Sequence, residues 1–401
     1  MYINRDIENL LKQSSKQFSA IALTGPRQTG KSTLLKRLFG KTHAYVTLDD
    51  PIMRQRAESD PKLFFESLGE KVIIDEIQYV PQLTSYIKIA IDEKRTSKGR
   101  FILTGSQQFH LIKNLGDSLA GRVAIFELLP FSSSEKKRIP SLRKKVMKSK
   151  DMFMLSCLRG CYPEPSVQQN IDINQWTAGY FQTYLERDIK SIFGIGDLRD
   201  FQRFMQLLAA RCSQVLNFST FAADIGVAVN TIKRWISVLE ASRIIYLLYP
   251  YHTNLGKRIV KAPKVYFLDC GLVCYLTGIH NKEILMNGPL AGPLFENYCI
   301  QETVKQIINT KKSVGLYYIR TNNNLEVDLL VEKEMALNPV EIKLNMTPRL
   351  SDASNLVRLK TVFAKLPIRP AKILSLSDTS FPLIKDVSVV SFDEYIKWLN
   401  Q

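Results

Sequence analysis

Long apolar runs, histidine and tryptophan are scarce in this sequence. No run of about 18 apolar residues occurs, so we expect no membrane-spanning helix. The N-terminus lacks the apolar segment of a signal peptide, and we therefore expect a cytoplasmic protein. The chain has 4 His and 6 Cys, with no Cys-x-x-Cys pair and no histidine beside a cysteine. Reduced thiols in the core are expected rather than a zinc site.

Acidic residues are too few to balance the basic ones. The sequence has 55 Lys and Arg against 38 Asp and Glu, which gives a formal net charge of +17 at pH 7. Such an excess favours a polyanionic partner, and DNA is the one expected here. General solubility explains the same charge, so composition leaves both interpretations open. The 401 residues are enough for two or three domains.

One glycine-containing segment gives the clearest chemical signal. Residues 25–32 fit the phosphate-loop pattern Gly-x-x-x-x-Gly-Lys-Ser, after an apolar run and before a predicted helix. Backbone N–H groups and the helix dipole then favour phosphate. We expect ATP and Mg²⁺ as cofactors, with Lys31 at the outer phosphates and Ser32 at the metal. The expected nucleotide-binding residues are Gly25, Pro26, Arg27, Gln28, Thr29, Gly30, Lys31, Ser32 and Thr33.

Predicted strands and helices alternate through the first 150 residues. This alternation indicates an α/β fold with a parallel sheet that is covered on both faces. Ligands of such sheets bind at the carboxyl ends of the strands, where the phosphate loop falls. The predicted strands are 19–24, 43–48, 71–74, 100–103 and 123–128, and the predicted helices are 3–17, 33–39, 54–68 and 81–95.

Four polar residues at strand ends are candidates for catalysis. Asp75 and Glu76 follow an apolar strand about 45 residues after the phosphate loop. We expect Asp75 to bind Mg²⁺ through water and Glu76 to orient and deprotonate the attacking water. Thr104 and Ser106 follow the next strand, where one of them would contact the γ-phosphate or the water. Simple turn formation is the alternative role for this pair.

Phosphoryl transfer also needs positive charge on the developing oxyanion, and a neighbouring subunit is a common source. Arg122 is the candidate for such an arginine, and this role would require a homo-oligomer. A structural salt bridge is the alternative role for Arg122. Arg187 is a second candidate.

Four motifs carry a family resemblance. GPRQTGKST, VIIDEIQ, ILTGS and LAGRV follow one another in this order. Together they resemble a large prokaryotic family of AAA-type ATPases whose members carry a C-terminal domain of unknown function. The resemblance continues through YLERDI and KVYFLDCGL and covers most of the chain. It implies ATP binding and hydrolysis.

A change in composition divides the chain. Residues 132–150 are rich in Lys, Arg and Ser, and we predict a surface segment near a domain boundary. Residues 173–213 have a helical pattern. We expect an ATPase domain at 1–150, a helical and winged-helix domain at 151–262 and a third domain at 263–401.

Residues 219–264 are typical of a helix-turn-helix followed by a basic wing. Two predicted helices, 219–224 and 230–241, meet at Gly226, with Asn230 as a helix N-cap. A basic hairpin containing Lys261 and Lys264 follows. DNA contact and use as an ATPase lid or protein contact remain equal alternatives. The expected DNA contacts are Lys233, Arg234, Lys257 and Arg258.

The C-terminal pattern resembles the restriction-endonuclease-like, or PD-(D/E)XK, fold. A helix containing Glu296 precedes a strand with Asp328 and a Glu-x-Lys strand with Glu341 and Lys343. Strand alternation puts Glu341 and Lys343 on one face. Glu296, Asp328 and Glu341 are then metal ligands, and Lys343 would activate water. Alternating charge on a solvent-facing strand is the competing interpretation.

The sequence thus predicts an α/β protein in three parts: an AAA-type P-loop ATPase core, a helical and winged-helix middle and a restriction-endonuclease-like end. The favoured function is ATP hydrolysis on or near DNA. One alternative is a nucleotide-gated switch that recruits proteins and uses the tail for docking. The other is a metal-dependent DNA nuclease that its ATPase regulates.

Overall fold

The N-terminal part is built on a parallel sheet. The computed structural model describes all residues except 106–118, 145, 185–197, 253–261, 322–324 and 364–365. Its five strands are parallel, as the sequence predicts, and they lie in the order β2-β3-β4-β1-β5. Their bounds are β1 Ala20–Thr24, β2 Ala44–Thr47, β3 Val72–Asp75, β4 Phe101–Thr104 and β5 Val123–Glu127.

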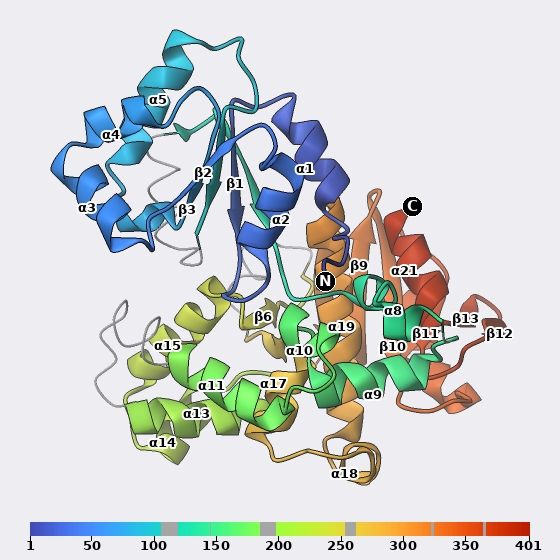
Figure 1. Cartoon of the computed structure of the whole chain (residues 1–401). Coiled ribbons are helices and arrows are strands. Elements are labelled where there is room, and N and C mark those ends of the chain that lie inside the picture. The colour runs from blue at the N-terminus through green and yellow to red at the C-terminus, as the bar shows by residue number, and fades with distance from the viewer. Residues whose placement is uncertain (106–118, 145, 185–197, 253–261, 322–324, 364–365) are drawn as a thin grey trace.

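Helices cover both faces of this sheet because alternate strand residues point to opposite sides (Figure 1). Ala20 and Ala22 belong to one core with α3, α4 and α5, and Ile21 and Leu23 belong to another with α1 and α2. The helix predicted at 54–68 is split, since Asp60 caps a new helix at Leu63 N. The helices are α1 Glu8–Ser15, α2 Lys31–Phe39, α3 Pro51–Ser59, α4 Pro61–Ser67 and α5 Leu83–Glu93, with a 3₁₀ turn η1 Ile77–Tyr79.

The segment after β5 is partly buried, so the prediction of a surface segment over 132–150 is wrong at its start. Ser132 and Glu135 form a capping box, and Glu135 is fully buried against Arg5. The start of this segment is not exposed as expected, because Arg5 near the N-terminus pairs with Glu135. The helices here are α7 Ser133–Lys136, α8 Pro140–Arg143, α9 Ser149–Arg159 and α10 Pro163–Val167.

The middle segment, residues 173–287, is mainly helical. The turn after α14 has Gly226 at φ 86°, a conformation that glycine adopts without strain. Asn230 is not an N-cap, because α15 begins earlier and Ala228 holds that place. Elements here are α11 Ile173–Tyr184, α13 Leu198–Ala210, α14 Phe218–Ile225, α15 Val229–Ala241, β6 Ile245–Leu248, β7 Lys264–Phe267, α17 Cys270–Leu276 and α18 Lys282–Asn287. Strands β6 and β7 pair antiparallel.

The C-terminal part is a mixed six-stranded sheet in the order β12-β13-β11-β10-β9-β8. Helices α19 and α21 share a core with one face, and α20 covers the other. The elements are α19 Ala291–Thr310, β8 Gly315–Arg320, β9 Glu326–Lys333, β10 Ala336–Ile342, η3 Leu350–Ala353, α20 Ser354–Val362, β11 Ala371–Leu374, β12 Phe381–Ile384, β13 Val387–Val390 and α21 Phe392–Asn400.

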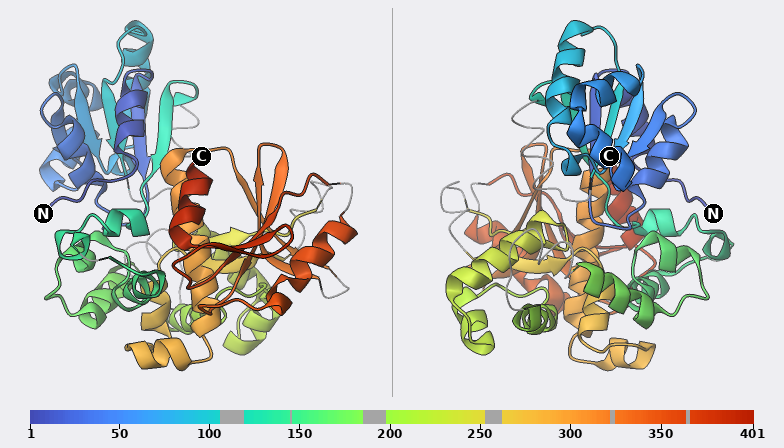
Figure 2. Two further views of the ribbon diagram at one scale, coloured as in Figure 1. Left: turned by 90° about the vertical axis from the view of Figure 1, so that its right-hand side faces the viewer. Right: turned by 60° about the vertical axis from the view of Figure 1, so that its left-hand side comes forward.

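One apolar core joins the middle segment to the C-terminal sheet. It includes Phe204 of α13, Trp235 of α15, Tyr266 of β7, Tyr298 of α19 and Tyr395 of α21. The N-terminal sheet has separate cores, and Figure 2 shows this domain standing above the rest in both views. Among the described helices, none combines the length and apolar character needed to cross a membrane.

Candidate functional site

The phosphate loop connects the end of β1 to the start of α2. Gly25 has φ 137°, and a Cβ at this position would lie 2.2 Å from Leu128 O, so only glycine fits. Gln28 and Gly30 also have positive φ, at 59° and 88°. Thr29 Oγ1 donates to Pro26 O at 2.9 Å, which closes the loop on itself. These contacts hold the loop in a curved shape at the N-terminus of a helix, where anions bind.

Two cations fix the loop from different sides. Lys31 is 6% exposed, and its ammonium donates to Gly25 O at 2.9 Å and to Pro26 O at 2.8 Å. Arg5 is 5% exposed and donates to Thr29 O at 2.8 Å, to Leu129 O at 2.6 Å and to Glu135 Oε1 at 2.9 Å. Arg5 is a contact that the sequence analysis missed, because it lies 24 residues before its loop partner.

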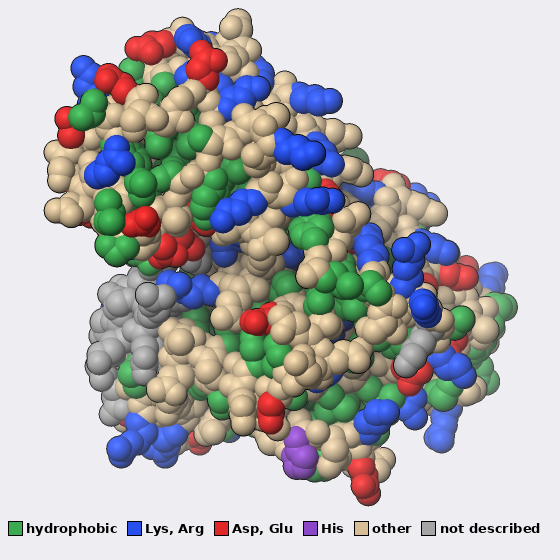
Figure 3. Space-filling model, viewed as in Figure 1, with side chains coloured by type: hydrophobic (Ala, Val, Ile, Leu, Met, Phe, Trp, Pro, Cys, Tyr) green, Lys and Arg blue, Asp and Glu red, His purple; other side chains and the backbone are tan. Residues whose placement is uncertain are grey.

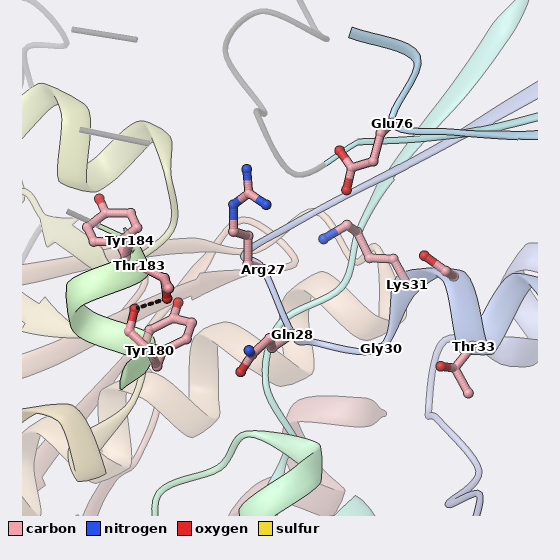
Figure 4. A pocket seen from close by; sticks show the side chains of 10 residues that line it. Arg27, Gln28, Gly30, Lys31, Thr33, Glu76, Tyr180, Thr183 and Tyr184 are labelled. Atoms are coloured by element: carbon pink, nitrogen blue, oxygen red, sulfur yellow. Dashed lines mark hydrogen bonds between the residues drawn. The ribbon is translucent and has the colours of Figure 1, made fainter. Parts of the chain in front are cut away.

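A cavity of about 320 Å³ opens in front of the loop. Figure 4 shows Arg27, Lys31 and Glu76 directed toward a shared space, with α11 on the opposite side. The expected nucleotide residues Gln28, Gly30, Ser32 and Thr33 also line it. The wall from α11 was not predicted, and it consists of Tyr180, Thr183 and Tyr184. No motif marks these three side chains, although Tyr184 begins the YLERDI segment.

Asp75 and Glu76 lie at the carboxyl end of β3, as predicted. Tyr45 OH donates to Asp75 Oδ2 at 2.6 Å, and Asp75 Oδ1 is buried without a partner in the described part of the chain. Burial, and then the hydrogen bond to Asp75, raise the pKa of Tyr45, so this hydroxyl stays a donor. Glu76 has φ 55° and accepts a hydrogen bond from Gln78 Nε2 while it lines the cavity.

Thr104 ends β4 next to β1, in register with Leu23. Its hydroxyl is buried and has no partner among the described residues. Ser106 lies outside the described residues. A hydrated cation or a phosphate would supply hydrogen-bond partners for Asp75 Oδ1 and Thr104 Oγ1, which lack them within the described residues. The residues present therefore fit a bound Mg²⁺–nucleotide.

Arg122 lies away from this cavity. Its carbonyl oxygen accepts a hydrogen bond from Ala20 N at the start of β1. Gly25 follows the other end of β1, so Arg122 and the phosphate loop lie at opposite ends of the strands. The guanidinium is paired with Asp92, through Nε to Oδ1 at 2.9 Å and Nη2 to Oδ2 at 3.0 Å. The salt-bridge alternative is therefore observed, and Arg122 is not brought to the phosphate loop of its own chain. Arg187 lies outside the described residues.

A second cavity of about 430 Å³ lies on the other side of the phosphate loop. Gln28, Gly30 and Thr33 line both cavities. The rest of its wall comes mainly from the N-terminus, the segment after β5 and α10, which the sequence analysis did not connect to the loop, and it includes the charged residues Arg5 and Glu164. The apolar residues of this wall include Tyr2, Ile3, Phe131, Pro163 and Val167.

The predicted nuclease-like residues lie close together, and Lys264, which was not predicted to join them, lies beside two of them. Glu296 of α19 and Asp328 of β9 both lie near Lys264 Nζ, at 3.2 Å and 3.8 Å. Lys343 Nζ lies 2.7 Å from Glu341 Oε1 on β10. We call Glu296, Glu326, Asp328 and Glu341 the carboxylate cluster. Within the described chain no group of three or more His, Cys, Asp or Glu has an arrangement that would hold a metal, so the predicted metal ligands remain a prediction.

Burial raises the pKa of two members of the carboxylate cluster. Burial, and then the charge of Asp328, raise the pKa of Glu296 to about 7 and that of Glu341 to about 8. Lys343 counteracts this shift at Glu341. A solvent-facing strand, the competing interpretation, does not describe Glu341, because this residue is only 4% exposed.

The expected DNA contacts are placed in part. Lys233 and Arg234 are exposed on α15, opposite its buried stripe of Ile232, Trp235 and Ile236. Lys257, Arg258 and Lys261 lie outside the described residues. Lys264 lies on β7, which pairs antiparallel with β6 as in the predicted hairpin, but its side chain is buried against the carboxylate cluster and does not add to a basic surface. All six cysteines are buried and none forms a disulfide, as expected for reduced thiols.

Three family models match successive parts of the chain. Residues 17–136 match an AAA domain. Residues 150–283 match a domain of unknown function (DUF8612), and residues 291–395 match another (DUF4143). The C-terminal match agrees with the resemblance inferred from the motifs, whereas no match tests the winged-helix or nuclease-like interpretation.

Two mycobacterial proteins are similar over nearly the whole chain. The uncharacterized proteins Rv2008c of Mycobacterium tuberculosis and Mb2031c of Mycobacterium bovis are each 29% identical over 394 residues, which is 98% of this chain and 84% of theirs. Among solved structures, the Walker-type ATPase PABY2304 of Pyrococcus abyssi covers 69% of this chain and 96% of its own, with 16% identity and a TM-score of 0.44. Residues 17–136, which contain the phosphate loop, are thus similar to AAA domains.

Proposed function

We propose that the protein binds ATP with Mg²⁺ and hydrolyses it. The observation that carries this proposal is a pair of buried oxygen atoms, Asp75 Oδ1 and Thr104 Oγ1, which have no partner among the described residues and lie at the strand ends beside the phosphate loop. Buried polar atoms are almost always hydrogen-bonded in folded proteins, so a bound ligand would complete them.

Each residue has a role that follows from its position. The loop amides and the Lys31 ammonium would hold the phosphates. Ser32 and, through water, Asp75 would hold Mg²⁺, which neutralises charge on the phosphates when bound. Glu76 would orient and deprotonate water, and the second cavity, beside Tyr2 and Phe131, would hold the base.

Glu76→Gln tests this assignment. The amide keeps the shape and removes the base, so we expect ATP binding to persist while turnover falls by about 10²–10⁴-fold. ATP affinity and phosphate release are measured on the same preparation. Glu70→Gln is the matched control, because Glu70 pairs with Lys94 on the surface and its turnover should equal that of the parent. Parental turnover in Glu76→Gln would assign Glu76 a structural role.

We propose further that the protein acts on or near DNA, with α15 as a contact. Lys233 and Arg234 are exposed on this helix, and the whole chain carries a net charge of +17. Figure 3 shows Lys and Arg side chains over both the upper and the lower part of one face. Cationic side chains that neutralise phosphates release counterions, so such binding is sensitive to salt.

The DNA proposal is tested with Lys233→Ala/Arg234→Ala. We expect weaker binding to single-stranded, duplex and branched DNA, and a salt dependence lowered by about 2 in log–log slope. Lys12→Ala/Lys16→Ala is the matched control, since it removes the same charge from α1 and its C-cap. Equal weakening in both variants would indicate a general charge effect. No salt-dependent binding by the parent would favour the protein-recruiting switch.

Arg122 remains our candidate for an arginine that acts on a neighbouring subunit. Its side chain is 28% exposed, so a partner surface can reach it beside Asp92. Mixing Arg122→Ala with Glu76→Gln protein should restore part of the ATPase activity, because one interface then carries both intact groups. If subunits shown to exchange recover no activity, Arg122 serves only as the partner of Asp92.

A further inference from the structure

Lys264 contacts three of the four members of the carboxylate cluster. Its side chain comes from β7 of the middle segment and is 4% exposed. The ammonium is 2.9 Å from Glu326 Oε1 and 3.2 Å from Glu296 Oε1, and Asp328 Oδ1 is 3.8 Å away. One cation from β7 is therefore surrounded by carboxylates from α19 and β9.

Other groups of the chain also donate hydrogen bonds to carboxylates of the cluster. Tyr266 OH donates to Glu296 Oε1 at 2.6 Å, and Ile342 N donates to Asp328 Oδ2 at 2.9 Å. Lys343 donates to Glu341 Oε1 at 2.7 Å, and within the described residues Glu341 Oε2 is buried without a partner. A metal ion entering this cluster would have to displace contacts that the protein itself supplies.

The carboxylates keep Lys264 charged. Burial alone lowers the pKa of an ammonium, but Glu296, Asp328 and Glu326 together outweigh burial and raise the pKa of Lys264 above its ordinary value. A charge in the interior persists only when opposite charges and hydrogen bonds surround it. Divalent cations such as Mg²⁺ and Mn²⁺ seek the same oxygen atoms, and an ammonium beside them repels a second cation.

We infer that Lys264 is the resident cation of the carboxylate cluster. It occupies the position where a divalent metal would otherwise bind, and it fastens β7 to α19 and β9. Lys264 lies in the residues that match one family, whereas Glu296, Glu326 and Asp328 lie in those that match another. The cluster is thus an ionic clamp between two modules, and the intact protein has no metal site there. This inference does not depend on ATP hydrolysis.

Replacement of the ammonium by an apolar chain of similar length tests the clamp. All samples carry Asp75→Asn and lack nucleotide, so Mn²⁺ does not report on the phosphate loop. In Lys264→Met we expect a Tm that rises with Mn²⁺ concentration, and about one bound Mn²⁺ per chain by electron paramagnetic resonance. Adding Asp328→Asn should abolish both signals. The protein with Lys264 intact should show no response that depends on Asp328.

Lys137→Met is the matched control, because Lys137 pairs with Asp393 on the surface and its loss should create no Mn²⁺ response. Two results would overturn the inference. One is Mn²⁺ binding by the Lys264 protein that Asp328→Asn removes. The other is a folded Lys264→Met protein that binds no Mn²⁺. If Lys264→Met fails to fold without metal, Mn²⁺ should restore folding, and failure to do so also counts against the clamp.

Discussion

The phosphate loop and the carboxylate cluster are both buried and charged, but they differ in what completes them. In front of the loop, a cavity of about 320 Å³ lies beside strand ends where Asp75 and Thr104 each keep a buried oxygen without a partner in the described chain. In the cluster, Lys264 and Lys343 contact the carboxylates directly. The first site is arranged for a ligand, whereas the second is largely satisfied by the chain.

This difference shows why a set of residue types does not define a site. Glu296, Asp328, Glu341 and Lys343 have the order of a nuclease site, and they do lie together. The residue that decides their chemistry is Lys264, which lies outside that order on a strand of the middle segment. At the loop, by contrast, the groups expected to bind the nucleotide lie within the motif or at an adjacent strand end, although Arg5 also holds the loop in shape.

The largest expected effect is the loss of ATP binding in Lys31→Ala. If Lys31 contacts phosphate as proposed, removing its buried charge should cost about 2–5 kcal/mol of binding free energy, or from roughly 30-fold to several thousand-fold in Kd. Titration of folded protein with ATP measures this, with Lys41→Ala after α2 as the control for lost charge. Unchanged ATP affinity would remove Lys31 from the site. Lys264→Met should leave ATP affinity unaltered, which would confirm that the two sites are separate.

The next effect concerns how the open site is held in shape. Arg5→Ala leaves the fully buried Glu135 without its cation and Thr29 O without its donor, so it should cost about 3–5 kcal/mol of unfolding free energy. Denaturant titration gives this value. Arg138→Ala breaks a pair with Asp6 in which the arginine is 43% exposed, and it should cost only about 0.2–1 kcal/mol.

If Arg5 positions the phosphate loop, its replacement should also change KM for ATP. Arg5→Lys keeps the charge but has one nitrogen in place of the three that contact Glu135, Thr29 O and Leu129 O. It should therefore restore part of the stability while KM for ATP stays raised. If both Arg5 variants lose stability but keep the parental KM, Arg5 supports the fold without shaping the loop.

Local pattern was enough to predict the N-terminal domain. Its strands are short apolar runs, and their alternation with helices predicts that they are parallel, although it does not predict their order in the sheet. The loop, Asp75 and Glu76 were placed correctly because a strand end fixes the residues that follow it. Tyr180, Thr183 and Tyr184 could not be found in this way, since their relation to the loop depends on how α11 packs.

Errors arose where distant segments supply a partner. Arg5 and Glu135 are 130 residues apart, so the charged segment after residue 132 appeared suited to solvent but is buried. Lys264 was expected to add to the basic charge of a hairpin because its sequence neighbours are basic, whereas its spatial neighbours are acidic. In each case the sequence gives the charge correctly, and only the tertiary contact decides whether water or an opposite charge surrounds it.

The last expected effect is a pH dependence of stability that arises in the carboxylate cluster. The pKa of Glu341 is raised to about 8, first by burial and then by Asp328, with Glu296 adding to this and Lys343 opposing it. The folded state therefore holds a proton that the unfolded chain releases near its ordinary pKa of about 4.5. The resulting stabilisation is complete below that pH and is lost as pH rises toward about 8.

Glu341→Gln isolates this contribution because the amide cannot titrate. We expect the unfolding free energy of the parent, relative to that of the variant, to fall with pH by at most ~1.4 kcal/mol per unit between about 4.5 and 8, and to be flat above. Denaturant titrations of both proteins across this range measure the difference. Glu334→Gln, in the exposed turn between β9 and β10, should show no such slope. A difference that stays constant with pH would mean that Glu341 is ionised in the folded protein, and the cluster would then carry more negative charge than Lys264 and Lys343 balance.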